Sequence, residues 1–145
     1  MSFILLCTIS LAAGTFDFAA TDVVNASKHV LRARDITIKE LFPRELVSEK
    51  IALDIELLEN YIADDQPDEN QGWMQARFSL YIRFCEISTT ETEVIIEAFF
   101  ERYGTRSALM LIPPSWVPVP SNGFLEEEIL HAIEERLTEI QGDEQ

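Results

Sequence analysis

Paired carboxylates are the residues of this sequence whose types and spacing come closest to a catalytic pattern. Asp54 and Glu56 lie two positions apart, and Glu93, Glu97 and Glu101 recur at every fourth position. Two carboxyl groups can act as general acid and general base when they share a cleft and their environments separate their pKa values. Both sets, however, lie in stretches where charged and apolar residues alternate, a pattern that places the charges on the solvated face of a strand. We therefore expect a structural role for these acids.

The expected structural role is a ladder of ion pairs. Arg77 and Arg83 lie on the stretch between the two acidic ones. Strands that pair in chain order would therefore set these arginines opposite carboxylates. Exposed pairs of this kind contribute about 0.2–1 kcal/mol each, so they fix strand register more than they stabilise the fold.

Other signatures of catalysis or metal binding are missing from the sequence. His29 and His131 are the only histidines, and they fall in separate predicted helices. There is no Cys-x-x-Cys, His-x-x-x-His or Gly-x-Ser-x-Gly motif and no glycine-rich phosphate loop. The acidic stretch 63–72 lacks the alternating ligands and central glycine of a calcium loop. We expect a protein that is not an enzyme and that has no cofactor and no dedicated metal site.

The net charge of −15 is concentrated in two blocks. Residues 51–76 hold seven acidic residues and no basic one, and residues 107–145 hold eight acidic residues and Arg136 alone. The resulting field repels nucleic acid and anionic membranes and attracts cationic surfaces. We expect a partner protein with a basic surface, no direct binding to nucleic acid and no association with membranes.

The apolar stretch 3–13 bears on the cellular compartment. It is too short to cross a bilayer, and because no Lys or Arg precedes Lys28 it lacks the basic region of a secretory signal. Cys7 and Cys85, two cysteines in a chain of 145 residues, indicate reduced, buried thiols rather than a disulfide framework. We expect a cytoplasmic protein in which 3–11 forms a buried strand. The alternative is a secreted protein with residues 1–12 as a signal peptide.

Alternation and helical periodicity predict the elements of the fold. Three strands with one apolar face each are expected at 51–57, 76–84 and 93–101, and a turn at 103–105 leads into a fourth at 106–112. The other elements expected before residue 51 are a short strand near Phe16 and Phe18 after a break at 13–15, a helix over 22–33 capped by Thr21, and a short strand at 36–38.

The last predicted element is an amphipathic helix that Ser121 or Asn122 can cap. It follows a Pro-rich connector at 113–122, whose four prolines cannot donate to a sheet, and it ends in a frayed acidic tail at 141–145. We expect residues 1–145 to form a single α+β domain. Its antiparallel meander sheet would have about four to six strands, with both helices packed on one face and 63–72 as an acidic loop.

Three groups of residues are candidates for contact with a partner. They are an acidic helix face of Glu127, Glu128, Glu134 and Glu135; the connector residues Trp116 and Val117; and Tyr81, Ile95 and Phe99, which with Leu58 would make the charged face of the sheet half apolar. Plainer interpretations are a solvated helix face and a tryptophan that closes the edge of the core. A half-apolar second face is more than a monomer usually exposes, which favours self-association or a partner.

These observations favour a non-catalytic, oligomeric protein–protein interaction module, such as an adaptor, assembly factor, chaperone or inhibitor. Three alternatives remain open. The chain could be an inhibitor that mimics nucleic acid, as some phage anti-defence proteins do, or a structural component of a phage or secretion assembly. It could also be a small enzyme with a carboxylate site that uses a residue such as Glu97 or Asp54.

Overall fold

A long antiparallel hairpin forms the centre of the fold. The computed structural model describes residues 11–41, 44–63, 72–105 and 113–143, and its longest strands are β5 (Gly72–Ser88) and β6 (Glu91–Thr105). On β6 the buried and less buried residues alternate strictly from Glu91 to Ala98, as the period-two pattern of the sequence predicts. The hairpin therefore has one face for the core and one face that points away from it.

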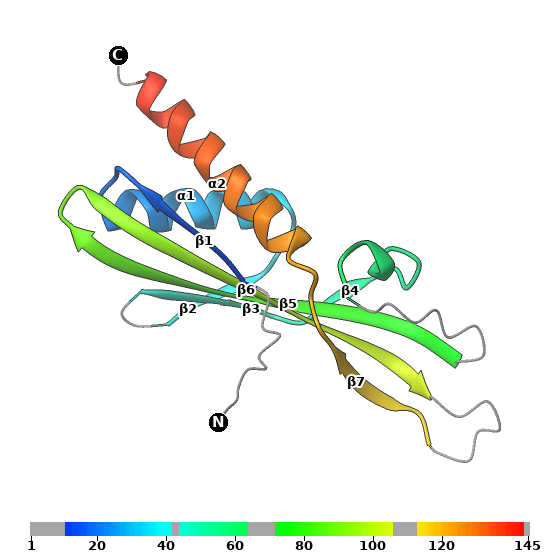
Figure 1. Cartoon of the computed structure of the whole chain (residues 1–145). Coiled ribbons are helices and arrows are strands. Elements are labelled where there is room, and N and C mark those ends of the chain that lie inside the picture. Colours follow the sequence, from blue (N-terminus) through cyan, green and yellow to red (C-terminus); the bar gives the residue numbers. More distant parts are fainter. Residues whose placement is uncertain (1–10, 42–43, 64–71, 106–112, 144–145) are drawn as a thin grey trace, which may run out of the picture.

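Shorter strands flank this hairpin on both sides (Figure 1). They are β1 (Leu11–Phe16), β2 (Ile38–Leu41), β3 (Glu45–Ser48), β4 (Ile51–Leu53) and β7 (Ser115–Val119). The sheet of the described residues has seven strands in the order β1-β6-β5-β3-β2, with β4 also on β5 and β7 also on β6. β1 and β7 thus share one edge of β6, where Leu11 of β1 lies opposite Glu97 and Val119, the last residue of β7, lies opposite Phe100.

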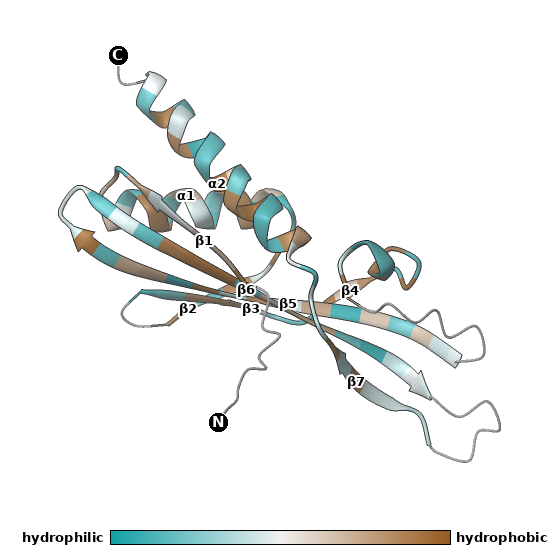
Figure 2. Ribbon diagram, viewed as in Figure 1, coloured by the Kyte–Doolittle hydropathy of each residue, from teal (hydrophilic) through white to brown (hydrophobic). Residues whose placement is uncertain are grey.

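Two helices cover a single face of this sheet, α1 (Ala20–Ala33) and α2 (Phe124–Asp143) (Figure 1). The apolar residues that α2 buries are spaced by four, which gives the helix one apolar stripe: Leu125, Ile129, Ile133 and Leu137. α1 buries Val23, Val30 and Leu31 beside them. Both helices are mosaics of polar and apolar residues in Figure 2, as expected for helices with one buried side. The predicted α+β class, with both helices on one face of an antiparallel sheet, is confirmed.

Several boundaries in the first half differ from the prediction. β1 runs without a break through 13–15, and α1 begins at Ala20 after Ala19, so Thr21 lies inside the helix and does not cap it. The predicted strand at 51–57 ends at Leu53, because the chain turns there and continues into the 3₁₀ helix η2 (Leu58–Asn60). The expected strand at 3–11, apart from Leu11, and most of the acidic loop at 63–72 lie outside the described residues.

The second half contains two further corrections. The connector at 113–122 is not a separate linker, because its central part forms β7 at the edge of β6, with Pro118 opposite Glu101. An edge strand tolerates proline because the missing N–H would only have faced away from the sheet. α2 extends through Asp143, so the frayed tail predicted at 141–145 is helical at least to that residue.

Gly104 continues β6 where the sequence predicted a turn at 103–105. It lies opposite Trp73, beside an irregularity in the register of β5. A Cβ atom on Gly104 would lie 2.8 Å from the Cα atom of Trp73 and would also overlap the backbone of Gly72. The strands approach so closely here that only glycine fits. The predicted fourth strand at 106–112 lies outside the described residues.

No helix of the described residues combines the length and the apolar character needed to cross a membrane.

We predict that Gly104→Ala destabilises the protein by about 1–3 kcal/mol, because the new methyl group meets backbone atoms that cannot rotate away. Urea unfolding followed by circular dichroism measures the change. Gly142→Ala is the matched control, since nothing lies within 4 Å of a Cβ at that helical position. There the alanine should stabilise the helix by up to about 1 kcal/mol. Equal stabilities for Gly104→Ala and the wild type would contradict this account of the strand contact.

Candidate interaction surface

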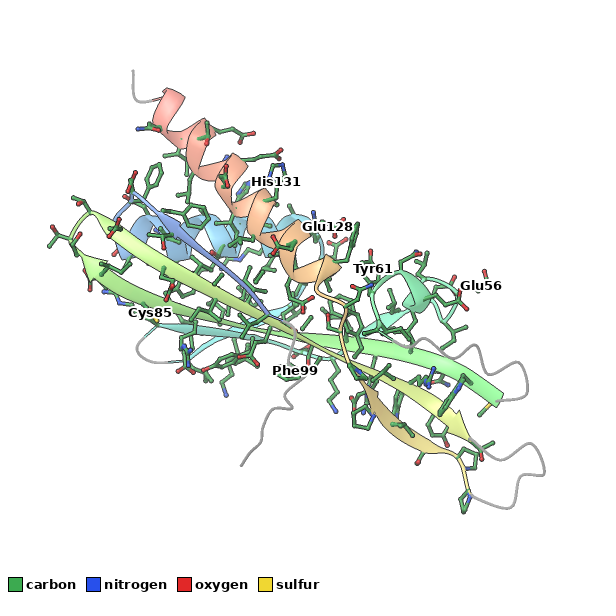
Figure 3. The ribbon with its side chains drawn as sticks, in the orientation of Figure 1. Glu56, Tyr61, Cys85, Phe99, Glu128 and His131 are labelled. Atoms are coloured by element: carbon green, nitrogen blue, oxygen red, sulfur yellow. The ribbon has the colours of Figure 1, made fainter. Side chains whose placement is uncertain are left out.

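The face of the sheet opposite α1 and α2, here called the outer face, is covered by no described helix. Its central residues are Glu93, Ile95, Glu97, Phe99 and Glu101 on β6 and Arg77, Ser79, Tyr81 and Arg83 opposite them on β5. In Figure 3 Phe99 lies on the side of the ribbon away from Glu128 and His131 of α2. The molecule therefore has a helical layer on one side and an open sheet on the other.

Apolar side chains interrupt the charges of this outer face. Phe99 is 49% exposed, and Leu11, opposite Glu97 on β1, is 48% exposed. Tyr81 and Ile95 are half-buried between their neighbours. The register thus brings Tyr81, Ile95 and Phe99 onto one surface, as the alternation of the sequence suggested. Leu58 does not belong to it, because it lies on η2 and is only 2% exposed.

One rung of the expected ladder of ion pairs is present at the end of the outer face near β7. Arg77 Nε donates a hydrogen bond to Glu101 Oε1 at 2.8 Å, and Lys50 Nζ lies 3.1 Å from the same oxygen. The hydrogen bond from Arg77, with Lys50 nearby, lowers the pKa of the Glu101 carboxyl below its usual value despite partial burial. Glu101 is therefore held as a carboxylate by two cations.

The rest of the ladder does not form within the chain. Asp54 lies in the turn after β4, where its Oδ1 accepts the backbone N–H of Glu56 at 3.1 Å. Neither residue reaches the strands. Among the described residues Arg83, Glu93 and Glu97 have no ion-pair partner, although they lie on adjacent strands. The outer face therefore presents unpaired charges of both signs.

Trp116 lies on the outer face, where its ring contacts Arg77 and Tyr103. It neither fills the edge of the core nor projects freely into solvent. The guanidinium carbon of Arg77 lies 3.7 Å from the centroid of its ring, and the ring of Tyr103 lies 5.4 Å away. This cation–π contact orients the arginine that binds Glu101. Val117 alternates to the opposite face of β7 and pairs with Arg102, so the two connector candidates do not act on one surface.

A groove of about 540 Å³ opens at the junction on the edge of β6 between Leu11 of β1 and Val119 of β7. Its walls include Lys50, Phe99 and Pro118. Glu126 of α2 lies at this junction, on the side of the sheet that the helices cover. Its side chain is completely buried, and Ser121 Oγ lies 2.8 and 2.7 Å from its two carboxylate oxygens.

Burial raises the pKa of the Glu126 carboxyl, although hydrogen bonds from Ser121 and from the backbone of Glu126 and Ala98 favour the charged form. Ala98 is one of the two β6 residues between Glu97, which pairs with Leu11 of β1, and Phe100, which pairs with Val119 of β7. Glu126 therefore hydrogen-bonds to the backbone of β6 between these two described pairs. The sequence alone does not single out Glu126, which belongs to a run of three glutamates at the start of the helix.

The acidic helix face lies on the opposite layer from the outer face. Glu127, Glu134 and Glu135 are exposed on α2. Glu128 is half-buried and pairs with Arg34 at the end of α1, at 3.2 Å. Glu135 lies 3.1 Å from His131 one turn earlier. The structure therefore separates the candidate acidic residues from Tyr81, Ile95 and Phe99, and the protein has two distinct surfaces.

Within the parts of the chain that the structure describes, no three His, Cys, Asp or Glu side chains gather to form a metal site. The sequence matches no model of a known protein family, and a search of curated proteins finds no relative. The arrangement of these surfaces therefore carries the functional argument.

The carboxyls of Glu126 and Glu101 should make opposite contributions to stability as the pH changes. The raised pKa of Glu126 means that its contribution is greatest below about pH 4.5 and is lost as the pH rises through the folded-state pKa. The lowered pKa of Glu101 means that its contribution is present above about pH 4.5 and is lost as the pH falls through the folded-state pKa.

We predict that the stability of the wild type relative to Glu126→Gln declines with rising pH, and that its stability relative to Glu101→Gln declines with falling pH. Chemical unfolding of the three proteins over a pH series measures both differences. The same sign for both would show that the environment of at least one carboxyl is assigned wrongly.

Proposed function

We propose that this chain is a non-catalytic protein–protein interaction module that works through its outer face. The observation that carries this proposal is the uncovered sheet face with Leu11 and Phe99 about half exposed. Both helices pack on the other side, so the face has no cover among the described residues. Exposed apolar side chains gathered on one surface are typical of a docking site.

The acidic side of α2 supports a second part of the proposal, a partner with a basic surface. Exposed carboxylates on one helix speed the approach of a cationic protein and help to select it, more than they strengthen the final complex. Because this side lies on the opposite layer from the outer face, both surfaces can be occupied together. Two separate binding surfaces of this kind fit an adaptor or assembly factor that works as an oligomer in the cytoplasm.

A carboxylate enzyme remains the alternative of a different class. It requires an accessible acid with a shifted pKa, and the described carboxyl with a raised pKa is that of Glu126. Glu126 is 0% exposed and is hydrogen-bonded to Ser121, which fits a structural role better than contact with a substrate. This contrast favours the interaction module.

We predict that a photo-cross-linking phenylalanine analogue at position 99 forms covalent adducts with protein under native conditions in the source cell. The same analogue at position 124 should form far fewer. Phe124 is a suitable control, because it is 56% exposed, as accessible as Phe99, but lies at the start of α2. Mass spectrometry of the adducts identifies what is attached. Equal yields at the two positions, or none at position 99, would contradict the proposal.

A further inference from the structure

We propose that the occupant of the outer face is a second copy of this chain, in a dimer whose two-fold axis runs along the seam between β5 and β6. This inference rests on the proposed function, since it requires the outer face to be a docking surface. It adds the identity of the partner and the orientation of the two copies.

The local charge of the outer face permits contact between two copies of an acidic protein. The chain carries a net charge of −15, so most approaches of one copy to another are repulsive. Over the stretch of β6 from Glu93 to Tyr103, however, the described part of the outer face carries five acids and four bases. The acids are Glu45, Glu49, Glu93, Glu97 and Glu101, and the bases are Lys39, Lys50, Arg77 and Arg83. This region is therefore close to neutral, and it also holds the exposed Phe99.

The charges of the outer face lie in rows along the strands, and this arrangement determines which two-fold axis brings opposite charges together. The acids Glu93, Glu97 and Glu101 follow β6, and the bases Arg77 and Arg83 follow β5. In a two-fold dimer the same surface of each copy meets the other, so every contact occurs twice. An axis parallel to the strands and between β5 and β6 places β5 of one copy over β6 of the other. Basic rows then meet acidic rows.

The other in-plane axis, perpendicular to the strands, gives the opposite result. It places β5 over β5 and β6 over β6, so arginines face arginines and glutamates face glutamates. Like charges brought together at an interface cost several kcal/mol and are a common means of excluding an arrangement. Only the axis along the seam makes the face complementary to itself.

With this axis, Arg83, Glu93 and Glu97, which lie beside the seam and have no ion-pair partner among the described residues, acquire one. Arg83 lies opposite Ile95 in the sheet, between Glu93 and Glu97, and it would meet the same three residues of the second copy. Phe99 lies opposite Ser79 and would reach the Ser79 and Tyr81 region of the second copy. The dimer would thus pair the unpaired charges of β5 and β6, whereas Lys39 and Glu45 lie on β2 and β3, farther from the seam.

The area of the face is sufficient for a stable dimer. The described strands form four rows across the face: β1 with β7, β6, β5, and β3 with β4. At ~4.8 Å between rows and ~3.3 Å per residue, four rows over about twelve residues cover roughly 750 Å². A standard protein interface buries about 800 Å² on each partner. Closure of this surface also removes Leu11 and Phe99 from water.

A charge exchange between two variants tests the axis directly. Arg83→Glu places a carboxylate opposite Glu93 and Glu97 of the second copy, and Glu97→Arg places a guanidinium opposite Arg83. Each variant alone should dimerise about tenfold more weakly than the wild type, or worse. An equimolar mixture should recover the wild-type affinity. In the mixed dimer the new carboxylate of one variant meets the new guanidinium of the other, and at the second, symmetry-related contact Arg83 meets Glu97 as in the wild type. Sedimentation velocity measures the affinity, and native mass spectrometry distinguishes the mixed dimer by its mass.

Arg32→Glu and Glu134→Arg form the matched control pair, since both residues are exposed on the helical layer and should leave dimerisation unchanged. Circular dichroism establishes that each variant folds, and Glu93→Arg replaces Glu97→Arg if the latter does not. A mixture that binds no better than either single variant overturns the proposed axis. A monomeric wild-type chain overturns the dimer, whether the face is covered by residues 1–10 or by another protein. In that case cross-linking at position 99 still decides the proposed function separately.

Discussion

The pairing of β5 with β6 is the interaction on which the rest of the structure depends. It sorts alternate side chains into a core face and an outer face along the whole length of both strands. α1 and α2 bury their apolar stripes against the core face, and every other strand attaches to one edge of this hairpin or to a strand that does. Because both helices pack on one side, no described helix covers the outer face.

The shared edge of β6 shows how the second half of the chain is joined to the first. β1 and β7 pair with the same edge, and Glu126 of α2 hydrogen-bonds into the junction between them. A buried carboxyl is costly unless it is fully hydrogen-bonded. Its position therefore couples the start of α2 to the backbone of Ala98. The same junction opens on the outer face as the groove beside Phe99, so the core and the interaction surface meet there.

The sequence predicted the features that depend on periodicity and missed those that depend on tertiary context. The alternation around Ile82 and Ile96 and the four-residue spacing in α2 predict β5, β6 and the helix, because burial on one side imposes a fixed repeat. The alternation at 51–57 extends past Leu53, yet β4 ends there because the chain turns into η2. Pro118 argued against a strand, and only its place at the edge of β6 permits one. The surface of Tyr81, Ile95 and Phe99 could be predicted, whereas the absence of partners for Arg83 could not, because it depends on how the strands end.

The fold separates the acidic residues behind the net charge into two groups. The acids on β6 are balanced locally by the bases beside them, while those on α2 lie on the opposite layer. We propose that this nearly balanced face closes against a second copy of the chain. Sedimentation equilibrium of the wild-type chain, from micromolar to submillimolar concentration and at low and high salt, tests it most directly. We expect a species of twice 16.6 kDa that dissociates on dilution, and a mass of 16.6 kDa under all conditions would contradict the dimer.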